Sequence, residues 1–208
     1  ASAPPPYRLD PPPAEPGQPW SFPRRLQMVE SWLASHGGGK EAWATEFGWS
    51  TCTPVGGSCQ SEDTQANYMV RAYGLLADNG FAHGTYFHFK DLAGGMPTLY
   101  QECALLRPDY STKPAYTAYT VMTTLLGAAQ YTGHGWAYDV DDSWDDLYDL
   151  RFYDPGSGMI VDLLWNLQGT DVVSIRLEPG VQAAFYYDRD GTYTTLTPTN
   201  GTVTVTVS

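Results

Sequence analysis

A glutamate at the end of a short apolar run is the residue of this chain best placed to do chemistry. Glu46 closes the run EAWATE (41–46) and is followed by Phe47 and Gly48. We expect residues 41–48 to form a buried strand that ends in an open loop, which leaves room for a ligand beside the carboxylate. A carboxylate in such a place can attack a reacting carbon or move a proton, so Glu46 is the candidate catalytic residue.

Alternation along this strand predicts which side chains lie near the carboxylate. Successive side chains of a strand point to opposite faces, so we expect Glu46 on one face and Trp43 and Phe47 together on the other. Trp49 follows just after the strand and offers a flat aromatic face on which a ligand ring can stack. We therefore place Trp49 beside Glu46 as a candidate ligand-binding residue.

The elements that position Glu46 alternate between helices and strands. Apolar residues at helical spacing predict three helices, which begin near Ser21, Glu62 and Pro114. Strands over 41–48 and 82–89 separate them. Such alternation is typical of a parallel sheet with crossover helices, whose strand ends carry the active sites of barrel enzymes. Two parallel strands present open edges, so other strands must complete this sheet.

The pattern changes to short strands after residue 130. Turn signals such as Pro179-Gly180 and Asp190-Gly191 separate segments that mostly alternate in polarity. The predicted strands are 147–153, 159–167, 171–177, 182–187, 193–196 and 201–207. We therefore predict an α/β segment over residues 1–130 and an antiparallel β-sandwich over residues 131–208.

Composition excludes some classes of partner. The chain has 11 basic and 23 acidic residues and a net charge of −12. We expect no nucleic-acid partner, because phosphate binding needs a basic surface. No apolar run approaches the ~20 residues of a membrane span, so we expect no membrane partner. The sequence begins inside a proline-rich stretch without a signal peptide, and we expect that further sequence precedes it.

The cysteines favour an exported protein and no metal. Cys52 and Cys59 lie in one Gly/Pro/Ser loop, close enough to form a disulfide, which is typical of secreted or extracellular proteins. Their spacing is too wide for a redox pair, and no His/Cys cluster completes a zinc site. Cys103 is left over, either as a buried inert thiol or paired outside this chain. The acidic run 139–146 lacks the glycine and glutamate of a calcium loop, so no cofactor is predicted.

Three segments together resemble one enzyme family. TEFGW (45–49) resembles the seventh-strand motif of the large clan of retaining (β/α)₈-barrel glycoside hydrolases, which includes cellulases, mannanases and β-xylosidases. GTYFHFKD (84–91) looks like the clan's eighth strand, and residues 105–119 are similar to the run before its last helix. The resemblance implies the C-terminal portion of a TIM barrel, comprising its last two strands and their helices, followed by a small antiparallel β-sandwich.

The same resemblance implies roles for individual residues. In the clan, the glutamate at the position of Glu46 is the nucleophile that cleaves a β-linked glycan. Tyr86 and His88 would face the barrel interior and bind the sugar, while Phe87 and Phe89 would contact the outer helices. Retention needs a second carboxyl group ~5–5.5 Å away. The clan's acid/base, usually in an Asn-Glu pair, has no counterpart here.

Two functions follow from these patterns. The leading hypothesis is part of a glycosidase that hydrolyses a carbohydrate substrate once joined to an N-terminal barrel portion, which is either a separate chain or a missing segment. That portion would supply the acid/base, and this chain alone would be inactive. The alternative is a non-catalytic carbohydrate-binding or interaction module whose incomplete barrel closes by self-association.

Overall fold

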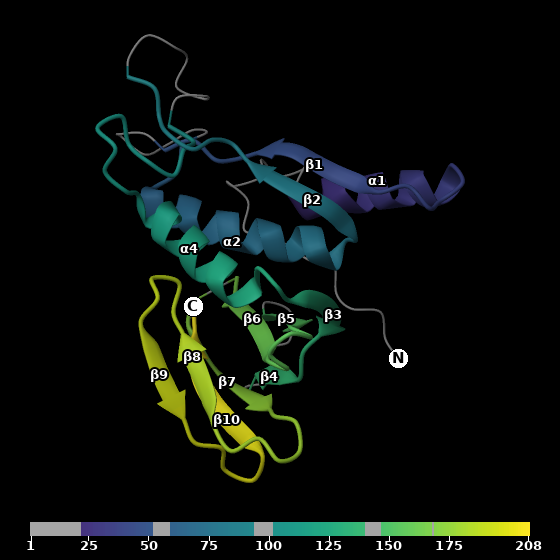
Figure 1. Ribbon diagram of the computed structural model, residues 1–208, viewed down its shortest axis with the longest axis vertical. Helices are drawn as coiled ribbons and strands as arrows, with labels where there is room; N and C mark the ends of the chain where they lie inside the picture. Colours follow the sequence, from purple (N-terminus) through teal and green to yellow (C-terminus); the bar gives the residue numbers. More distant parts are fainter. Residues whose placement is uncertain (1–21, 52–58, 94–101, 140–146, 168) are drawn as a thin grey trace. The chain divides into compact units, whose positions relative to one another are not determined.

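The fold consists of two compact units, which are described separately. One unit lies within residues 22–124 and the other within residues 125–208, a division close to the predicted boundary after residue 130. The computed structural model (Figure 1) describes residues 22–51, 59–93, 102–139, 147–167 and 169–208.

The first unit alternates between helices and parallel strands, as the sequence predicts. Its elements are α1 (Phe22–Ser35), β1 (Ala42–Phe47), α2 (Glu62–Asp78), β2 (Phe81–Tyr86) and α4 (Pro114–Leu126), whose last turn passes into the second unit. β1 pairs with β2 in parallel, and α2 is the crossover between them (Figure 1). Among the described residues no third strand joins this sheet.

Helix α2 forms the centre of this unit. Its N-cap is Ser61, whose side chain accepts a hydrogen bond from the Thr64 N–H at 3.0 Å, and acidic residues in the first turn favour the positive end of the helix. The apolar core joins α2 to α4. Its buried members are Ala66, Met69, Leu105, Ala115 and Ala118.

Strand β1 carries an irregularity at the residue of greatest interest. Ala44 lies opposite Gly84, and Phe47 lies opposite Tyr86. Three steps along β1 therefore match two steps along β2, which is the signature of a bulge with one extra residue in β1. The extra residue falls at Thr45 and Glu46, both of which are exposed.

The bulge decides which side chains face the helices. A Cβ at Gly84 would lie 2.7 Å from Leu76 Cδ1 of α2, so this face of β2 is the one covered by helices. Phe47 is buried on the same side, which leaves Glu46 on the opposite, open face. Trp43 was predicted to share the face of Phe47, and this is wrong. It pairs with exposed His83, the neighbour of Gly84, with ring centroids 4.1 Å apart.

Helix α1 shows a large apolar surface to solvent. Leu26 is buried, but Met28, Val29 and Trp32 are 47%, 40% and 57% exposed. A helix that packs on one side normally turns its apolar residues toward the core of the protein. This helix therefore keeps apolar surface that the described residues of its unit do not cover. No helix of the described residues is long and apolar enough to cross a membrane.

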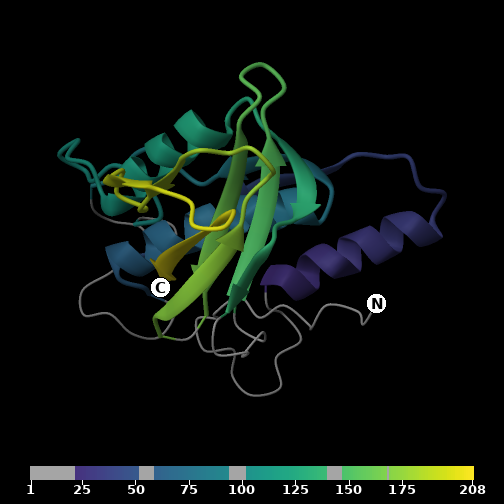
Figure 2. The same cartoon turned by 90° about the horizontal axis from the view of Figure 1, so that it is seen from below.

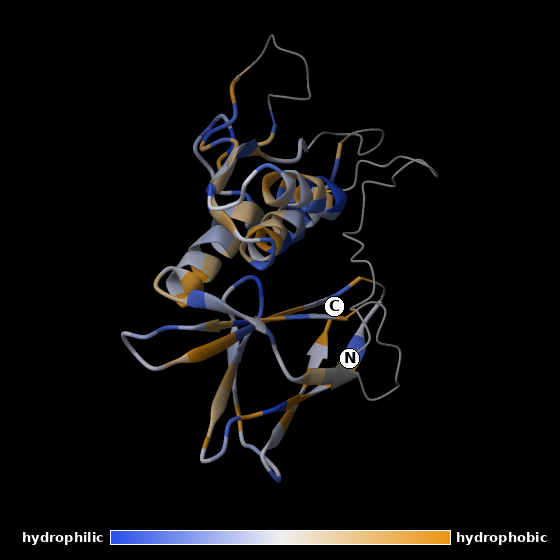
Figure 3. Cartoon of the chain, turned by 90° about the vertical axis from the view of Figure 1, so that its right-hand side faces the viewer, coloured by the Kyte–Doolittle hydropathy of each residue, from blue (hydrophilic) through white to orange (hydrophobic). Residues whose placement is uncertain are grey.

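The second unit contains several antiparallel sheets (Figure 2). The sheet orders are β3-β5-β6, β10-β7-β4 and β8-β9. Figure 3 shows apolar and polar residues intermixed along these strands, as expected where one face is buried. The strands are β3 (Gln130–His134), β4 (Ala137–Asp139), β5 (Leu147–Tyr153), β6 (Ile160–Asn166), β7 (Asp171–Arg176), β8 (Ala184–Tyr187), β9 (Tyr193–Leu196) and β10 (Thr202–Val207).

A buried carboxylate lies inside this second unit. Asp149 of β5 accepts a hydrogen bond from the Ala137 N–H at 2.7 Å. Gly135 covers it so closely that a Cβ there would lie 2.1 Å from Asp149 Oδ2, so only glycine fits. Burial, followed by the negative charge of Asp162, raises the pKa of Asp149 to about 6, and the nearby Arg151 only partly opposes this.

The raised pKa predicts how pH changes stability. The folded state holds the Asp149 proton more tightly than the unfolded state, whose pKa is near 3.8. The associated stabilisation is therefore complete below pH ~4 and is lost as pH rises through ~6, a cost of about 2–3 kcal/mol. Asp149→Asn stays neutral and keeps an acceptor for Ala137. We expect its advantage over wild type in the free energy of unfolding to grow between pH 4 and pH 7 in urea titrations.

The exposed carboxylate Asp190 offers a matched control for this measurement. Its side chain is 55% exposed and belongs to a turn of the same unit. Asp190→Asn should show no comparable growth with pH. An effect of Asp149→Asn that is constant across this pH range would contradict the prediction.

Candidate functional site

Glu46 lies where the two parallel strands end. It is exposed on the open face, one residue before the last residue of β1. The strand ends approach each other closely at the next two residues. The Phe87 N–H donates to Phe47 O at 2.7 Å, and a Cβ at Gly48 would lie 2.5 Å from Phe87 O. Gly48 is therefore required for this approach, which sets the position of the backbone that carries Glu46.

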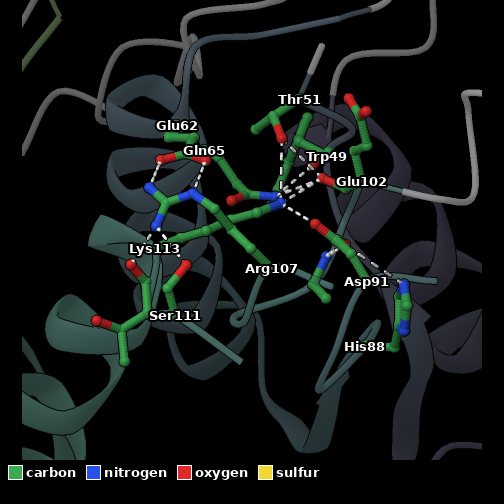
Figure 4. Close-up of polar contacts among 12 residues, drawn as sticks. Trp49, Thr51, Glu62, Gln65, His88, Asp91, Glu102, Arg107, Ser111 and Lys113 are labelled. Atoms are coloured by element: carbon green, nitrogen blue, oxygen red, sulfur yellow. Dashed lines mark hydrogen bonds and ion pairs between the residues drawn. The ribbon is translucent and has the colours of Figure 1, made fainter. Parts of the chain in front are cut away.

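A buried ion pair lies beside these strand ends (Figure 4). Lys113 Nζ is 2.5 Å from Asp91 Oδ2, and the two side chains are only 2% and 3% exposed. The other Asp91 oxygen accepts from the Ala104 N–H at 2.8 Å. Lys113 also donates to Thr51 Oγ1 at 3.1 Å and to the Glu102 carbonyl at 2.9 Å. Both charges thus have full hydrogen-bonding partners, which a buried pair needs.

Helix α2 is tied to the same region through two polar side chains (Figure 4). Gln65 Nε2 donates to the carbonyl oxygens of Trp49 at 2.7 Å and Glu102 at 3.2 Å. At the start of the helix, Glu62 pairs with Arg107, with Nε and Oε1 2.9 Å apart. The loop after β1, the loop after β2, and the helices α2 and α4 are therefore held together by polar contacts.

His88 lies at the edge of this network. Its Nε2 is 3.8 Å from Asp91 Oδ1, and the side chain is 20% exposed. Nε2 is buried without a hydrogen-bond partner in the described part of the chain. The peptide bond between Phe87 and His88 is cis. His88 Nε2 is therefore shielded from solvent, and the predicted sugar-binding role of His88 stays a prediction.

Two other predicted ligand-binding residues lie on the helix-covered side. The ring of Trp49 contacts those of Phe22, Phe47 and Tyr68, with centroids 5.8, 6.1 and 5.4 Å away. Trp49 is therefore part of an aromatic cluster among helices, and its ring is not beside Glu46 on the open face.

The predicted face of Tyr86 is wrong for the same reason. Tyr86 packs against the core between α2 and α4, and its ring is 5.7 Å from that of Phe47. Burial, with the charges of Cys103 and Asp91 as smaller causes, strongly raises the pKa of Tyr86. Phe89, expected to contact the outer helices, is instead 65% exposed. Simple alternation predicts neither the bulge in β1 nor that the helices cover the face of β2 that carries Gly84 and Tyr86.

The cysteines agree only in part with their predicted roles. Burial, followed by the charge of Asp91 and more weakly that of Glu46, raises the pKa of the Cys103 thiol to about 11. Cys103 is therefore a neutral, unreactive thiol within electrostatic reach of Glu46. Cys59 is buried, but Cys52 lies outside the described residues, so their disulfide stays a prediction. No cluster of three metal-ligating side chains occurs in the described ranges.

Comparison with known proteins finds similarity among solved structures. No protein-family model and no curated protein matches this chain. A family 39 glycoside hydrolase from the gut symbiont Bacteroides cellulosilyticus WH2 superposes with a TM-score of 0.66 over 91% of this chain, at 23% identity. The chain shares the fold of a glycoside hydrolase segment. It spans 36% of the length of that hydrolase.

A second solved structure is more distant. A β-glucuronidase 2 from Bacteroides uniformis matches 88% of this chain and 24% of its own, with 12% identity and a TM-score of 0.37. The family 39 match confirms the coarser sequence prediction, a mixed α/β and antiparallel β fold related to glycoside hydrolases.

The ion pair predicts the cost of removing one partner. Asp91→Ala would leave Lys113 charged and buried without its counter-ion, which we expect to lower the free energy of unfolding by about 3–5 kcal/mol. Lys113→Met should cost a similar amount. The double variant should cost clearly less than the sum, because it leaves no uncompensated charge. Chemical denaturation of the four proteins gives the coupling energy.

The pair between Arg189 and Asp190 is a suitable control. Its Asp190 side chain is 55% exposed, so Asp190→Ala should cost no more than about 1 kcal/mol. Additive costs for Asp91 and Lys113 would show that the buried pair does not act as a unit.

Proposed function

We propose that this chain is part of a retaining glycoside hydrolase that cleaves β-linked glycans, with Glu46 as its nucleophile. One observation carries the proposal. Glu46 is an exposed carboxylate on the open face of a parallel sheet, at a bulge beside the carboxyl ends of the strands. The likeness to a family 39 glycoside hydrolase and the TEFGW motif support the same assignment.

The proposed chemistry is a double displacement at the anomeric carbon. The Glu46 carboxylate attacks that carbon, and the leaving oxygen takes a proton from a second carboxylic acid. The covalent glycosyl-enzyme is then hydrolysed by a water that the second carboxylate deprotonates. The exposure of Glu46 on the open face gives a sugar access to it.

The second carboxyl group comes, on this proposal, from an N-terminal barrel portion. β1 and β2 would be the last two strands of a (β/α)₈ barrel, and the β unit would be its appended sandwich. The open strand edges and the exposed apolar surface of α1 support a missing neighbour. The chain also spans only 36% of the matched hydrolase. A carbohydrate and this barrel portion are therefore the proposed partners.

The buried polar network would hold the nucleophile in a fixed position. A catalytic carboxylate must be placed to within roughly 0.5 Å, which demands a rigid backbone behind it. Gly48 and Phe87 fix the strand ends, while Asp91 and Lys113 fix the loops that follow them. On this proposal His88, whose side chain is 20% exposed beside Asp91, would contact the sugar through its exposed atoms.

Replacement of the nucleophile tests the assignment. In the protein with its complete barrel, Glu46→Gln should lower kcat by about 10³-fold or more, because the amide cannot form the covalent intermediate. Glycan binding should persist. A 2-deoxy-2-fluoro glycoside should label the wild type on the peptide that contains Glu46, as measured by mass spectrometry, and should not label Glu46→Gln.

Glu41 provides a matched carboxylate just before the same strand. It is exposed and hydrogen-bonded to the Trp43 indole N–H at 3.0 Å. Glu41→Gln should leave both turnover and labelling close to wild type. Near-normal turnover in Glu46→Gln, or labelling of another peptide, would rule out Glu46 as the nucleophile.

A further inference from the structure

The β8–β9 hairpin has one face that its unit buries. Ala184, Tyr186 and Leu196 pack against the apolar core formed by β7 and β10. The Tyr186 hydroxyl donates to the Thr206 carbonyl at 3.3 Å. The alternation of a half-buried hairpin then calls for polar side chains on the other face.

The other face carries aromatic rings instead. Phe185, Tyr187 and Tyr193 are 60%, 40% and 60% exposed, and we call these three residues the aromatic platform. Tyr187 lies directly opposite Tyr193, with stacked rings 5.5 Å apart, and Phe185 is 6.5 Å from Tyr193. A cross-strand pair alone would account for the two tyrosines. It does not account for Phe185, whose partner across the hairpin is Thr195.

The turn beside the platform holds it in one shape. The Asp188 carboxylate accepts from the N–H groups of Asp190 at 3.0 Å and Thr192 at 2.8 Å. The Asp188 backbone also donates to the Thr192 carbonyl at 2.9 Å, and the Gly191 N–H donates back to the Asp188 carbonyl at 3.1 Å. The rings are therefore preorganised, which reduces the entropic cost of binding a ligand.

We propose that the aromatic platform binds neutral carbohydrate, as a sugar-binding surface of the β unit. A pyranose ring presents apolar C–H groups on its faces and hydroxyl groups around its rim. The flat aromatic rings can stack on these C–H faces, and the hydroxyls of Tyr187 and Tyr193 can hydrogen-bond with the sugar hydroxyls. The choice of a glycan as ligand rests on the proposed function, in which a glycan is also the substrate.

The size of the platform favours a small ligand over a protein. An aromatic side chain offers about 150–250 Å² of surface, so these three partly exposed rings present on the order of 300 Å². A stable protein interface needs about 800 Å² on each partner. A patch of roughly 300 Å² is typical of a functional site on a monomer.

Charge favours a neutral ligand. The platform is flanked by Asp188 and Asp190, and the Arg189 side chain is engaged with Asp190 at 3.0 Å. The chain as a whole carries a net charge of −12. A phosphorylated ligand, a nucleic acid or an anionic membrane would therefore be repelled.

Binding of defined oligosaccharides to the full 208-residue chain tests the proposal. The probes are cellohexaose, mannohexaose and xylohexaose, measured by isothermal titration calorimetry. Tyr193→Thr and Phe185→Thr remove a ring and keep a residue suited to a strand, so the hairpin should fold, as circular dichroism can verify. Each should weaken binding of the preferred sugar roughly tenfold. Tyr187→Phe keeps the ring and loses only the hydroxyl, so it should weaken binding less than Tyr193→Thr does.

Tyr153→Thr is the control for general loss of an exposed aromatic. Tyr153 is 42% exposed on β5, outside the platform, and its replacement should leave binding unchanged. Glu46→Gln should also leave platform binding unchanged, so failure of the nucleophile assignment would not be mistaken for failure here.

Three results would overturn the proposal that the platform binds a sugar. The first is that none of the sugars binds at millimolar concentration. The second is that correctly folded Tyr193→Thr and Phe185→Thr chains bind as tightly as wild type. The third is a wild-type dimer in analytical ultracentrifugation that Tyr193→Thr converts to monomer, which would make the rings a protein interface.

Discussion

The buried pair of Asp91 and Lys113 is the interaction on which the α/β unit depends. Removing two charges from water costs several kcal/mol each, and their attraction repays this only with good geometry and further hydrogen bonds. Here the carboxylate also binds a backbone N–H, and the ammonium binds a hydroxyl and a carbonyl. These partners come from the loops after both strands. The requirement to satisfy the two charges thus imposes one arrangement on segments that have little regular structure of their own.

The bulge in β1 determines that Glu46 is exposed on this fixed scaffold. Without it, the face of Glu46 would follow from simple alternation, and Phe47 would share the face of Trp43. The extra residue instead lets Phe47 pack under the helices while Glu46 stays exposed on the open face. Gly48 then allows the backbone to pass within contact distance of Phe87. Bulges of this kind are found beside active sites because they re-aim one side chain without disturbing the rest of a strand.

How much could be predicted from the sequence depended on whether a signal was periodic. The helices, both parallel strands and the six later strands have strong apolar repeats or turn residues, and all appear near the predicted positions. β3 and β4 were missed, because β3 is mostly polar with Gly133 inside it and β4 has only three residues.

The site itself was less predictable, because its contacts are not periodic. Asp91 and Lys113 both fall in segments with family-like motifs, but nothing in either segment predicts that the two residues form an ion pair. Tyr86 was assigned to the wrong face, because alternation gives two faces and does not say which one the helices cover. Glu46 was proposed as the nucleophile because its neighbours form a motif, and that assignment stays a prediction.

The same geometry bears on where the second carboxyl group of the proposed retaining mechanism could come from. A retaining mechanism needs a second carboxyl group that can hold and release a proton ~5–5.5 Å from the nucleophile. Asp91 is near the strand ends, but its side chain is only 3% exposed and paired with Lys113, so it is out of reach of a sugar. Glu41 lies just before β1, five residues from Glu46. A strand extends about 3.3 Å per residue, so Glu41 is too far away. The open face beside Glu46 is therefore where a complementary barrel portion would have to bring the second carboxyl group.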